Sequence, residues 1–207
     1  YEKYKNVDFT AKNINSVIEL INKARKNEGI DISPLRELLE KTLNEDIIRK
    51  SNKDFGLVTV WWDKKINPHP LYIEDIPNKR LIDYLIASSS LPIFQLNRID
   101  DKLFLDGMFF DNMPVSLLEQ KGYEDIVVIR LLDDFLGKIN LNKYQNINIK
   151  TIVPSAYLGG SLNKDKDNVQ KNINLGYLDA MKAYDRYEGI KYYFNEDYMF
   201  DEEYCFN

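Results

Sequence analysis

The spacing of apolar and polar residues divides the first part of the chain into helical and extended segments. Apolar residues recur at helical spacing in residues 13–29 and again in residues 31–43. In the second of these segments Ser33 precedes Pro34, which is typical of a helix N-terminus. Residues 55–76 are instead rich in β-branched and aromatic side chains. They predict two strands joined by a turn-prone sequence that contains two prolines.

Helical and extended patterns then alternate in shorter segments. Residues 78–90 have helical spacing and are followed by Pro92, which favours the end of a helix there. Residues 102–107 predict a strand that stops at a glycine. Residues 114–122 begin with proline and end with glycine, the asymmetry expected of a short helix.

The remaining pattern indicates the fold class. Residues 125–132 are apolar almost throughout, as expected of a strand covered on both faces, and residues 148–155 repeat this pattern. A long helix is predicted at 165–189. Strand, helix and strand in this order predict a three-layer α/β/α fold with a mostly parallel central sheet. We expect one domain over 1–207, whose C-terminal tail, residues 190–207, either packs on the body or frays.

Composition excludes several classes of function. The chain is 44% hydrophobic and 29% charged, which is typical of a folded protein with a sizeable core. Its net charge of -5 leaves no strongly basic surface for phosphates, so a nucleic-acid partner is not expected. No apolar run approaches the roughly 20 residues that cross a bilayer.

Cysteine and histidine are scarce, and this limits the chemistry further. Cys205 is the single cysteine and cannot form a disulfide within the chain, which favours a reducing, cytoplasmic location. The chain starts at Tyr1, so a secretion signal on a longer precursor stays open. His69 is the single histidine and lies between two prolines, where a surface turn is the better interpretation than a catalytic triad. We expect neither a metal nor a cofactor.

A candidate catalytic group lies at the end of the strand predicted at 102–107. Asp106 is followed by Gly107, and this dipeptide taken alone is a common tight turn. The end of a strand, however, is where α/β sheets place ligands and catalytic groups. The sequence therefore presents a strand-end carboxylate with no histidine or nucleophile next to it.

The segments around this aspartate resemble a known family. The sequences IASSSLPIFQ at 86–95, DKLFLDGM at 101–108 and DNMPV at 111–115 resemble the second catalytic block of the patatin-like phospholipases. The resemblance extends over roughly residues 31–183. It implies a lipid acyl hydrolase in which a serine hydroxyl attacks an ester carbonyl and an aspartate is the general base, without a histidine. Asp106 matches that aspartate.

Two departures from the family concern the site itself. Gly107 matches the family's turn glycine, but Met108 stands where the family has glycine or alanine, so it narrows the acyl pocket or disturbs the turn. The family's Gly-rich oxyanion loop and Gly-x-Ser-x-Gly elbow are not found, and the nearest string, residues 159–163, lacks the last glycine and follows Asp106. We therefore expect the chain to supply the aspartate of the dyad but not the serine. The N-terminal part of the domain is expected to be missing, and the isolated chain to be inactive on esters.

Residues near Asp106 have two interpretations each. Ser88, Ser89 and Ser90, with Pro92, either line an acyl channel or let the helix end pack closely, and the general behaviour of serine near helix ends favours close packing. Asn112 either bonds to the loop after Asp106, as the resemblance suggests, or caps the next helix.

Three classes of function remain. The favoured one is part of a lipid acyl hydrolase that acts on phospholipids or other acyl esters, with peripheral membrane contact. The second is a non-catalytic protein with the same scaffold, a pseudoenzyme or lipid-binding module, which the missing nucleophile and Met108 suggest. The third is an assembly domain that buries an apolar face by oligomerising. The sequence does not indicate an oligomeric state.

Overall fold

The computed structural model describes residues 29–63, 65–95, 97–131, 144–159 and 165–188, together with residues 22, 194 and 195. The contacts of the chain divide it into two compact units, Tyr1–Lys121 and Gly122–Asn207. The helix predicted at 13–29 and the tail at 190–207 lie almost entirely outside the described residues. The single domain over 1–207 stays a prediction.

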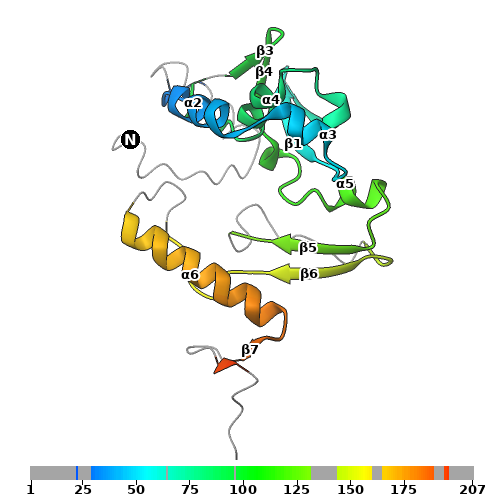
Figure 1. Ribbon diagram of the computed structural model, residues 1–207. Coiled ribbons are helices and arrows are strands. Elements are labelled where there is room, and N and C mark those ends of the chain that lie inside the picture. Colours follow the sequence, from blue (N-terminus) through cyan, green and yellow to red (C-terminus); the bar gives the residue numbers. More distant parts are fainter. Residues whose placement is uncertain are drawn as a thin grey trace, which may run out of the picture. The chain divides into compact units, whose positions relative to one another are not determined.

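The first unit, of which Figure 1 labels strands β1, β3 and β4, contains a four-stranded sheet in the order β2-β1-β4-β3. Its strands are β1 (Gly56–Trp62), β2 (Ile66–Tyr72), β3 (Asn97–Ile99) and β4 (Lys102–Asp106). All three pairings in this sheet are antiparallel, so the prediction of a mostly parallel sheet is wrong here.

Short connections explain two of the three antiparallel pairings, β1 with β2 and β3 with β4. Trp62 pairs with Ile66 at the end of a hairpin, and Ile99 pairs with Lys102 across a two-residue turn. Both residues of that turn, Asp100 and Asp101, have positive φ angles of 49° and 64°. Connections this short can join only antiparallel strands, because a parallel pair needs a crossover of a dozen or more residues.

Helices surround this sheet. They are α2 (Ser33–Thr42), α3 (Glu45–Lys50), α4 (Leu81–Ser88) and α5 (Val115–Gln120), with single 3-10 turns η2 (Ile73–Asp75) and η3 (Gly107–Phe109). Helix α4 packs against β1 and β4, and α2 packs against α4. Ser33 is not the N-cap of α2: Ile32 holds that place, and the N–H of Ser33 donates to Asp31 Oδ1 at 2.9 Å.

The core of the first unit has two clusters on opposite faces of the sheet. One joins Leu57, Leu71 and Phe104 of the sheet to Leu81, Tyr84 and Ala87 of α4. The other contains Val60, Leu103 and Leu105. Trp61 packs on the first cluster and Trp62 on the second, which confirms the predicted alternation of the two tryptophans. His69 lies within β2 rather than in a turn.

An ion pair with low exposure fastens α3 to the start of α4. Arg49 binds Glu45 and also donates to the carbonyl oxygens of Ile73 and Ile76, each at 2.8 Å. Glu45 in turn accepts the backbone N–H groups of Lys79 and Leu81. These bonds satisfy N–H groups at the start of α4. The side chain of the N-cap residue, Arg80, makes no capping bond of its own.

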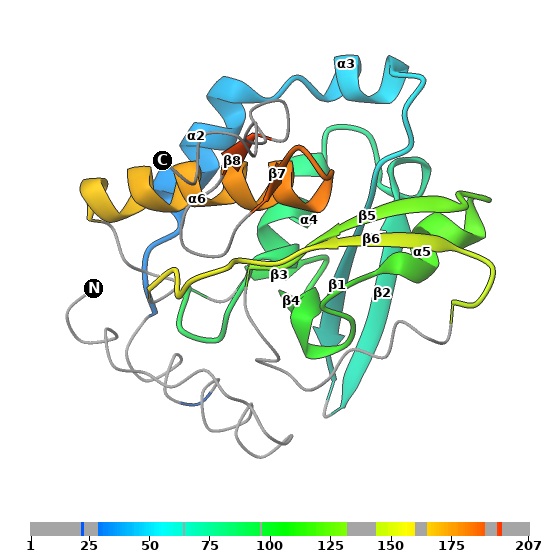
Figure 2. The ribbon, with the colours of Figure 1, turned by 90° about the horizontal axis from the view of Figure 1, so that it is seen from below.

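The second unit contains a parallel pair of strands and a long helix (Figure 2). Strand β5 (Asp125–Ile129) pairs in parallel with β6 (Asn148–Ile152), and α6 (Lys166–Ala183) packs against β6. A short antiparallel pair, β7 (Tyr187–Glu188) and β8 (Phe194–Asn195), follows. The predicted parallel pairing is therefore confirmed for this pair of strands.

Strand β5 is covered on one face rather than two. Ile126 and Val128 are buried, whereas Val127 and Ile129 are 46% and 68% exposed. The predicted burial of both faces is therefore wrong for β5. None of the helices in the described part of the chain combines the length and the apolar character that a bilayer crossing requires.

Candidate active site

Three elements of the first unit hold Asp106 in place. It is the last residue of β4 and pairs with Thr59 of β1. Its backbone N–H donates a 2.9 Å hydrogen bond to the carbonyl oxygen of Ser90, just beyond α4. Thr59 is fully buried, and its Oγ1 donates to the carbonyl oxygen of Leu105 at 2.8 Å. The backbone that carries the carboxylate is thereby fixed on both sides.

The carboxyl group of Asp106 has an unusual acidity. Burial raises its pKa to about 6, and the opposing contribution comes from the N–H of Met108, which donates to Oδ1 at 2.9 Å. A buried carboxyl group loses hydration when it ionises, so the neutral form is favoured. A carboxylate with a pKa near neutral pH is a much better general base than an ordinary aspartate.

Gly107 is required by a close approach of the backbone. A Cβ atom at this position would lie 2.2 Å from the carbonyl oxygen of Val58 in β1. Its φ is not in the left-handed region, so the turn itself does not demand glycine. The sequence predicted that a tight turn requires glycine here. In the structure, the close contact with β1 requires it instead.

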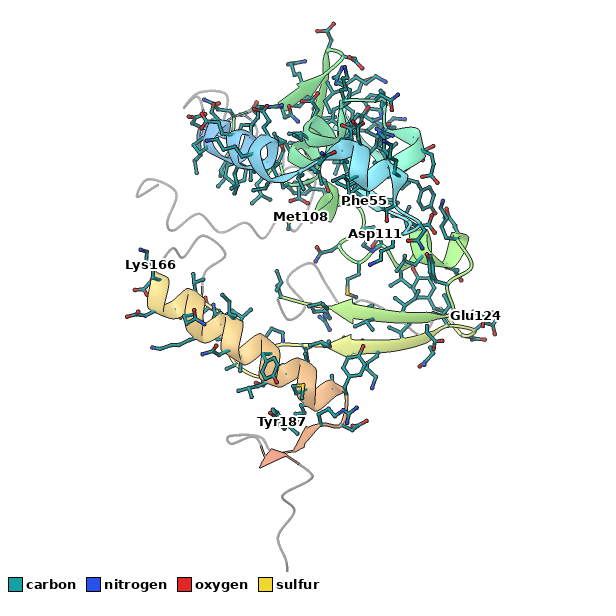
Figure 3. All side chains as sticks on the ribbon, viewed as in Figure 1. Phe55, Met108, Asp111, Glu124, Lys166 and Tyr187 are labelled. Carbon is teal, nitrogen blue, oxygen red and sulfur yellow. The ribbon has the colours of Figure 1, made fainter. Side chains whose placement is uncertain are left out.

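The segment after Gly107 is closed by local hydrogen bonds. The N–H groups of Phe110 and Asp111 both donate to the carbonyl oxygen of Gly107 at 2.9 Å. Asp111 Oδ1 accepts the N–H of Met113 at 3.0 Å, and Figure 3 shows Met108 and Asp111 on this segment. This role of Asp111 was not predicted from the sequence. The available signal was an aspartate two residues before the N–H that it accepts, the pattern of an Asx turn.

The three predicted serines bond to backbone carbonyl groups. Ser88 Oγ donates to Val58 at 2.7 Å, Ser90 Oγ donates to Ile86 at 2.6 Å, and Ser89 Oγ donates to Leu85 and Ile86. Ser90 and Pro92 are buried. Within the described residues no hydrogen bond joins these hydroxyls to the Asp106 carboxylate. These contacts agree with the close-packing interpretation, and a role for these residues in an acyl channel stays a prediction.

Asn112 is exposed and does not cap the following helix. Helix α5 begins at Val115, and its N-cap is Pro114, which makes no side-chain cap bond. The predicted cap is therefore wrong, since α5 starts two residues later than that interpretation requires. A bond from Asn112 to the loop after Asp106 stays a prediction.

The single histidine lies near this site in the sheet but does not reach it. Thr59 pairs with His69 on one side and with Asp106 on the other. Strand spacing places two residues on either side of a strand about 10 Å apart, too far for a direct hydrogen bond. Among the described residues no group of three or more histidines, cysteines and carboxylates is arranged to hold a metal ion.

Comparison with known families decides the relationship. A model of the patatin-like phospholipase family matches residues 4–118. This chain belongs to the patatin-like phospholipase family. The match contains all four strands of the antiparallel sheet and Asp106 with its turn, and it ends within α5. Patatin-like proteins have an α/β fold and are usually lipid hydrolases, and the mixture of helices and sheets agrees with that fold class.

The patatin-like match does not extend over the second unit. The wider resemblance suggested by the sequence, up to residue 183, therefore stays a prediction beyond Leu118. Comparisons with curated proteins and with solved structures gave no match.

Proposed function

We propose that this chain contributes to the hydrolysis of acyl esters in phospholipids or related lipids, with Asp106 as the general base of a serine–aspartate dyad. The observation that supports this most directly is the pKa of about 6 of a largely buried carboxyl group at a strand end, inside the patatin-like match. Such a group is ionised for most of the time at neutral pH and still accepts a proton readily.

The proposed reaction needs no histidine. The Asp106 carboxylate takes the proton of a serine hydroxyl as that oxygen attacks the ester carbonyl, giving a tetrahedral intermediate. The protonated carboxyl group then gives the proton to the departing alcohol as the carbon–oxygen bond breaks. In the second half, the carboxylate takes a proton from water as the water oxygen attacks the acyl-enzyme. It then returns this proton to the serine oxygen as the acyl–serine bond breaks and the fatty acid leaves.

The serine is proposed to come from outside this chain. The 207 residues contain no Gly-x-Ser-x-Gly pentapeptide, and Ser88, Ser89 and Ser90 bond to carbonyl oxygens. A serine on a strand-to-helix elbow and an oxyanion loop would complete the site when a segment that carries them is present. We propose peripheral contact with a membrane surface, since the substrates are lipids, and a cytoplasmic location.

Ester hydrolysis by two forms of the protein tests this proposal. The 207-residue chain alone is expected to show no turnover of a short-chain p-nitrophenyl ester or of phosphatidylcholine. A form of the protein that is supplied with an elbow serine is expected to hydrolyse them and to lose at least about 100-fold in rate on Asp106→Asn. Asp101→Asn is the matched control, because this carboxylate is exposed in the β3–β4 turn. Equal rates in wild type and Asp106→Asn would overturn the assignment of Asp106.

A non-catalytic protein with the same scaffold is the second candidate. It is favoured by the absence of the pentapeptide from the sequence and by Met108, which is half-buried next to the Asp106 carboxylate. A natural-source protein that binds lipid vesicles, yet neither hydrolyses esters nor reacts with a fluorophosphonate probe for active serines, would establish this alternative.

A further inference from the structure

A cavity in the first unit lies apart from Asp106. It has a volume of about 560 Å³, and its walls come from β1, β2, β4, α4 and the turns beside them. Phe104 and Lys102 of β4 line it, two and four residues before Asp106. At the usual rise of a strand these positions lie about 7 and 14 Å from Asp106. Asp106 is not among the lining residues, so the cavity is separate from the candidate active site.

Aromatic rings form much of its wall. The His69 ring centroid lies 5.9 Å from that of Phe104 and 6.3 Å from that of Tyr84, and Tyr84 meets Phe104 edge to face at 5.9 Å. Trp61 pairs with Phe104 on the neighbouring strand and also lines the cavity. Burial lowers the pKa of His69, and the positive charge of Lys102 lowers it further, so this ring is neutral at pH 7.

Charges of both signs lie at the edge of this aromatic wall. Lys102 is exposed, and its Nζ lies 4.9 Å from the centre of the Trp61 ring. A cation is therefore already held against this aromatic surface by the attraction between a positive charge and a π face. Asp75 lines the same cavity, and within the described residues no carboxylate lies within ion-pair distance of Lys102.

We propose that this cavity binds a small zwitterion that carries a quaternary ammonium and a phosphate group, as phosphocholine does. The quaternary ammonium lies against the rings of Trp61, Tyr84 and Phe104 on the side of Asp75. The phosphate pairs with Lys102, whose exposed side chain turns from Trp61 to the ligand without disturbing the core.

The charge pattern selects this ligand over simpler ones. A lone organic cation would be repelled by Lys102 and would compete with it for Trp61. An aromatic anion would satisfy Lys102 but would bring its charge near Asp75 and Asp100. A primary ammonium is strongly hydrated and needs hydrogen-bond acceptors, which aromatic faces do not supply as well as carbonyl groups do. A quaternary ammonium has no N–H to satisfy, so an aromatic wall suits it.

Calorimetric titration of the 207-residue chain tests the proposal. The probes are phosphocholine, choline and inorganic phosphate, and phosphocholine is expected to bind most tightly because it uses both halves of the cavity. Lys102→Gln is expected to weaken phosphocholine by about fivefold and to leave choline unchanged or slightly tighter. Trp61→Leu is expected to weaken both phosphocholine and choline by about fivefold or more.

A matched control separates the cavity from general charge effects. Lys65 is exposed in the β1–β2 turn and does not line the cavity, so Lys65→Gln should bind phosphocholine like wild type. Absence of phosphocholine binding at about 10 mM, an affinity too weak to be useful, overturns the proposal. Equal binding by Lys102→Gln, Trp61→Leu and Lys65→Gln overturns it as well. If Trp61→Leu fails to fold, Lys102→Gln still tests the proposal, because Lys102 is exposed and its replacement leaves the core intact.

Vesicles distinguish the two sources of this chemistry. Co-sedimentation with phosphatidylcholine vesicles, but not with phosphatidylglycerol vesicles, and release by free phosphocholine would identify a lipid headgroup as the ligand. Binding of free phosphocholine without vesicle binding would identify a soluble zwitterion. None of these measurements requires acyl-ester hydrolysis. A protein that does not hydrolyse esters can therefore still bind phosphocholine, and a protein that does not bind phosphocholine can still hydrolyse esters.

Discussion

The backbone N–H of Asp106 donates a 2.9 Å hydrogen bond to the carbonyl oxygen of Ser90, which ties the end of β4 to the segment that leaves α4. Ser88, two residues earlier, donates its hydroxyl to Val58 of β1. The end of α4 is therefore fastened to both strands that surround Gly107. The serine-rich sequence and the Asp-Gly turn are parts of one structural junction.

The raised pKa of Asp106 predicts how the stability of the first unit depends on pH. The folded pKa of about 6 lies above the value near 4 of an unfolded aspartate, so the native state binds the proton more tightly. This contribution to stability is full below pH 4, falls between pH 4 and 6, and is lost above pH 6. Two pKa units correspond to about 3 kcal/mol.

Asp106→Asn removes this pH dependence. The variant is expected to be more stable than wild type at pH 8, by up to about 3 kcal/mol, and to differ little at pH 4. Urea unfolding at the two pH values, followed by tryptophan fluorescence, measures the difference. Asp101→Asn serves as the control and should show no such change with pH. Parallel pH profiles for wild type and Asp106→Asn would show that the carboxyl group is not buried as described.

Gly107→Ala is expected to be strongly destabilising. The new methyl group would lie 2.2 Å from the Val58 carbonyl oxygen, so β1 and β4 must separate locally. We expect a loss of about 2–4 kcal/mol in the free energy of unfolding, in the range of severe steric substitutions. Gly176→Ala in α6 is the control, since no atom lies within 4 Å of its Cβ and alanine favours a helix. A wild-type midpoint for Gly107→Ala in urea unfolding would contradict the close approach.

Arg49→Met tests the fastening of α3 to the start of α4. The guanidinium side chain is 20% exposed and bonds to Glu45 and to three backbone carbonyl groups. Its removal leaves the Glu45 carboxylate without its counter-charge and these carbonyl groups without their donor, which is expected to cost about 2–4 kcal/mol. Arg36→Met, which breaks the more exposed pair with Asp83, should cost less than about 1 kcal/mol. Similar midpoints for the two variants in urea unfolding would argue against the network.

Thr59→Val probes the buried hydroxyl next to Asp106. The substitution keeps the shape of the side chain but removes the 2.8 Å bond to Leu105, and we expect a loss of about 1–2 kcal/mol. Thr42→Val removes a similar bond, to Leu38, at an exposed position and should change stability by less than about 0.5 kcal/mol. The difference between the two variants in thermal unfolding measures the effect of burial.

Local features of the sequence predicted several elements but not α3 or β3, and most of β2 lies in residues predicted as a turn. The strand that ends at Gly107, the helix at 78–90 and the glycine after α5 all follow from patterns within a few residues. Gly122 has a φ of 82°, as a residue after a helix end commonly does. The position of Asp106 at a strand end was predicted for the same reason.

Features that depend on distant residues were not predictable. The antiparallel pairing of β1 with β4 joins strands that are far apart in the sequence, and the local patterns instead favoured a parallel crossover. Position 107 requires glycine because the Val58 carbonyl oxygen lies so close to it. The N-terminus of α4 is capped by Glu45, which lies 36 residues before Leu81. The pairing of β1 with β4 decides which residues lie beside Asp106, and no pattern within a few residues specifies which distant strand pairs with which.

The contact between position 107 and Val58 has a consequence for how the Asp-Gly pair is interpreted in related chains. Selection for a folded sheet alone would retain this glycine, whether or not the neighbouring carboxylate takes part in a reaction. A descendant that had lost hydrolysis would be free to change Asp106 long before it could change Gly107. Packing of the sheet therefore accounts for Gly107 by itself, whereas only the proposed role as general base would require an aspartate at position 106.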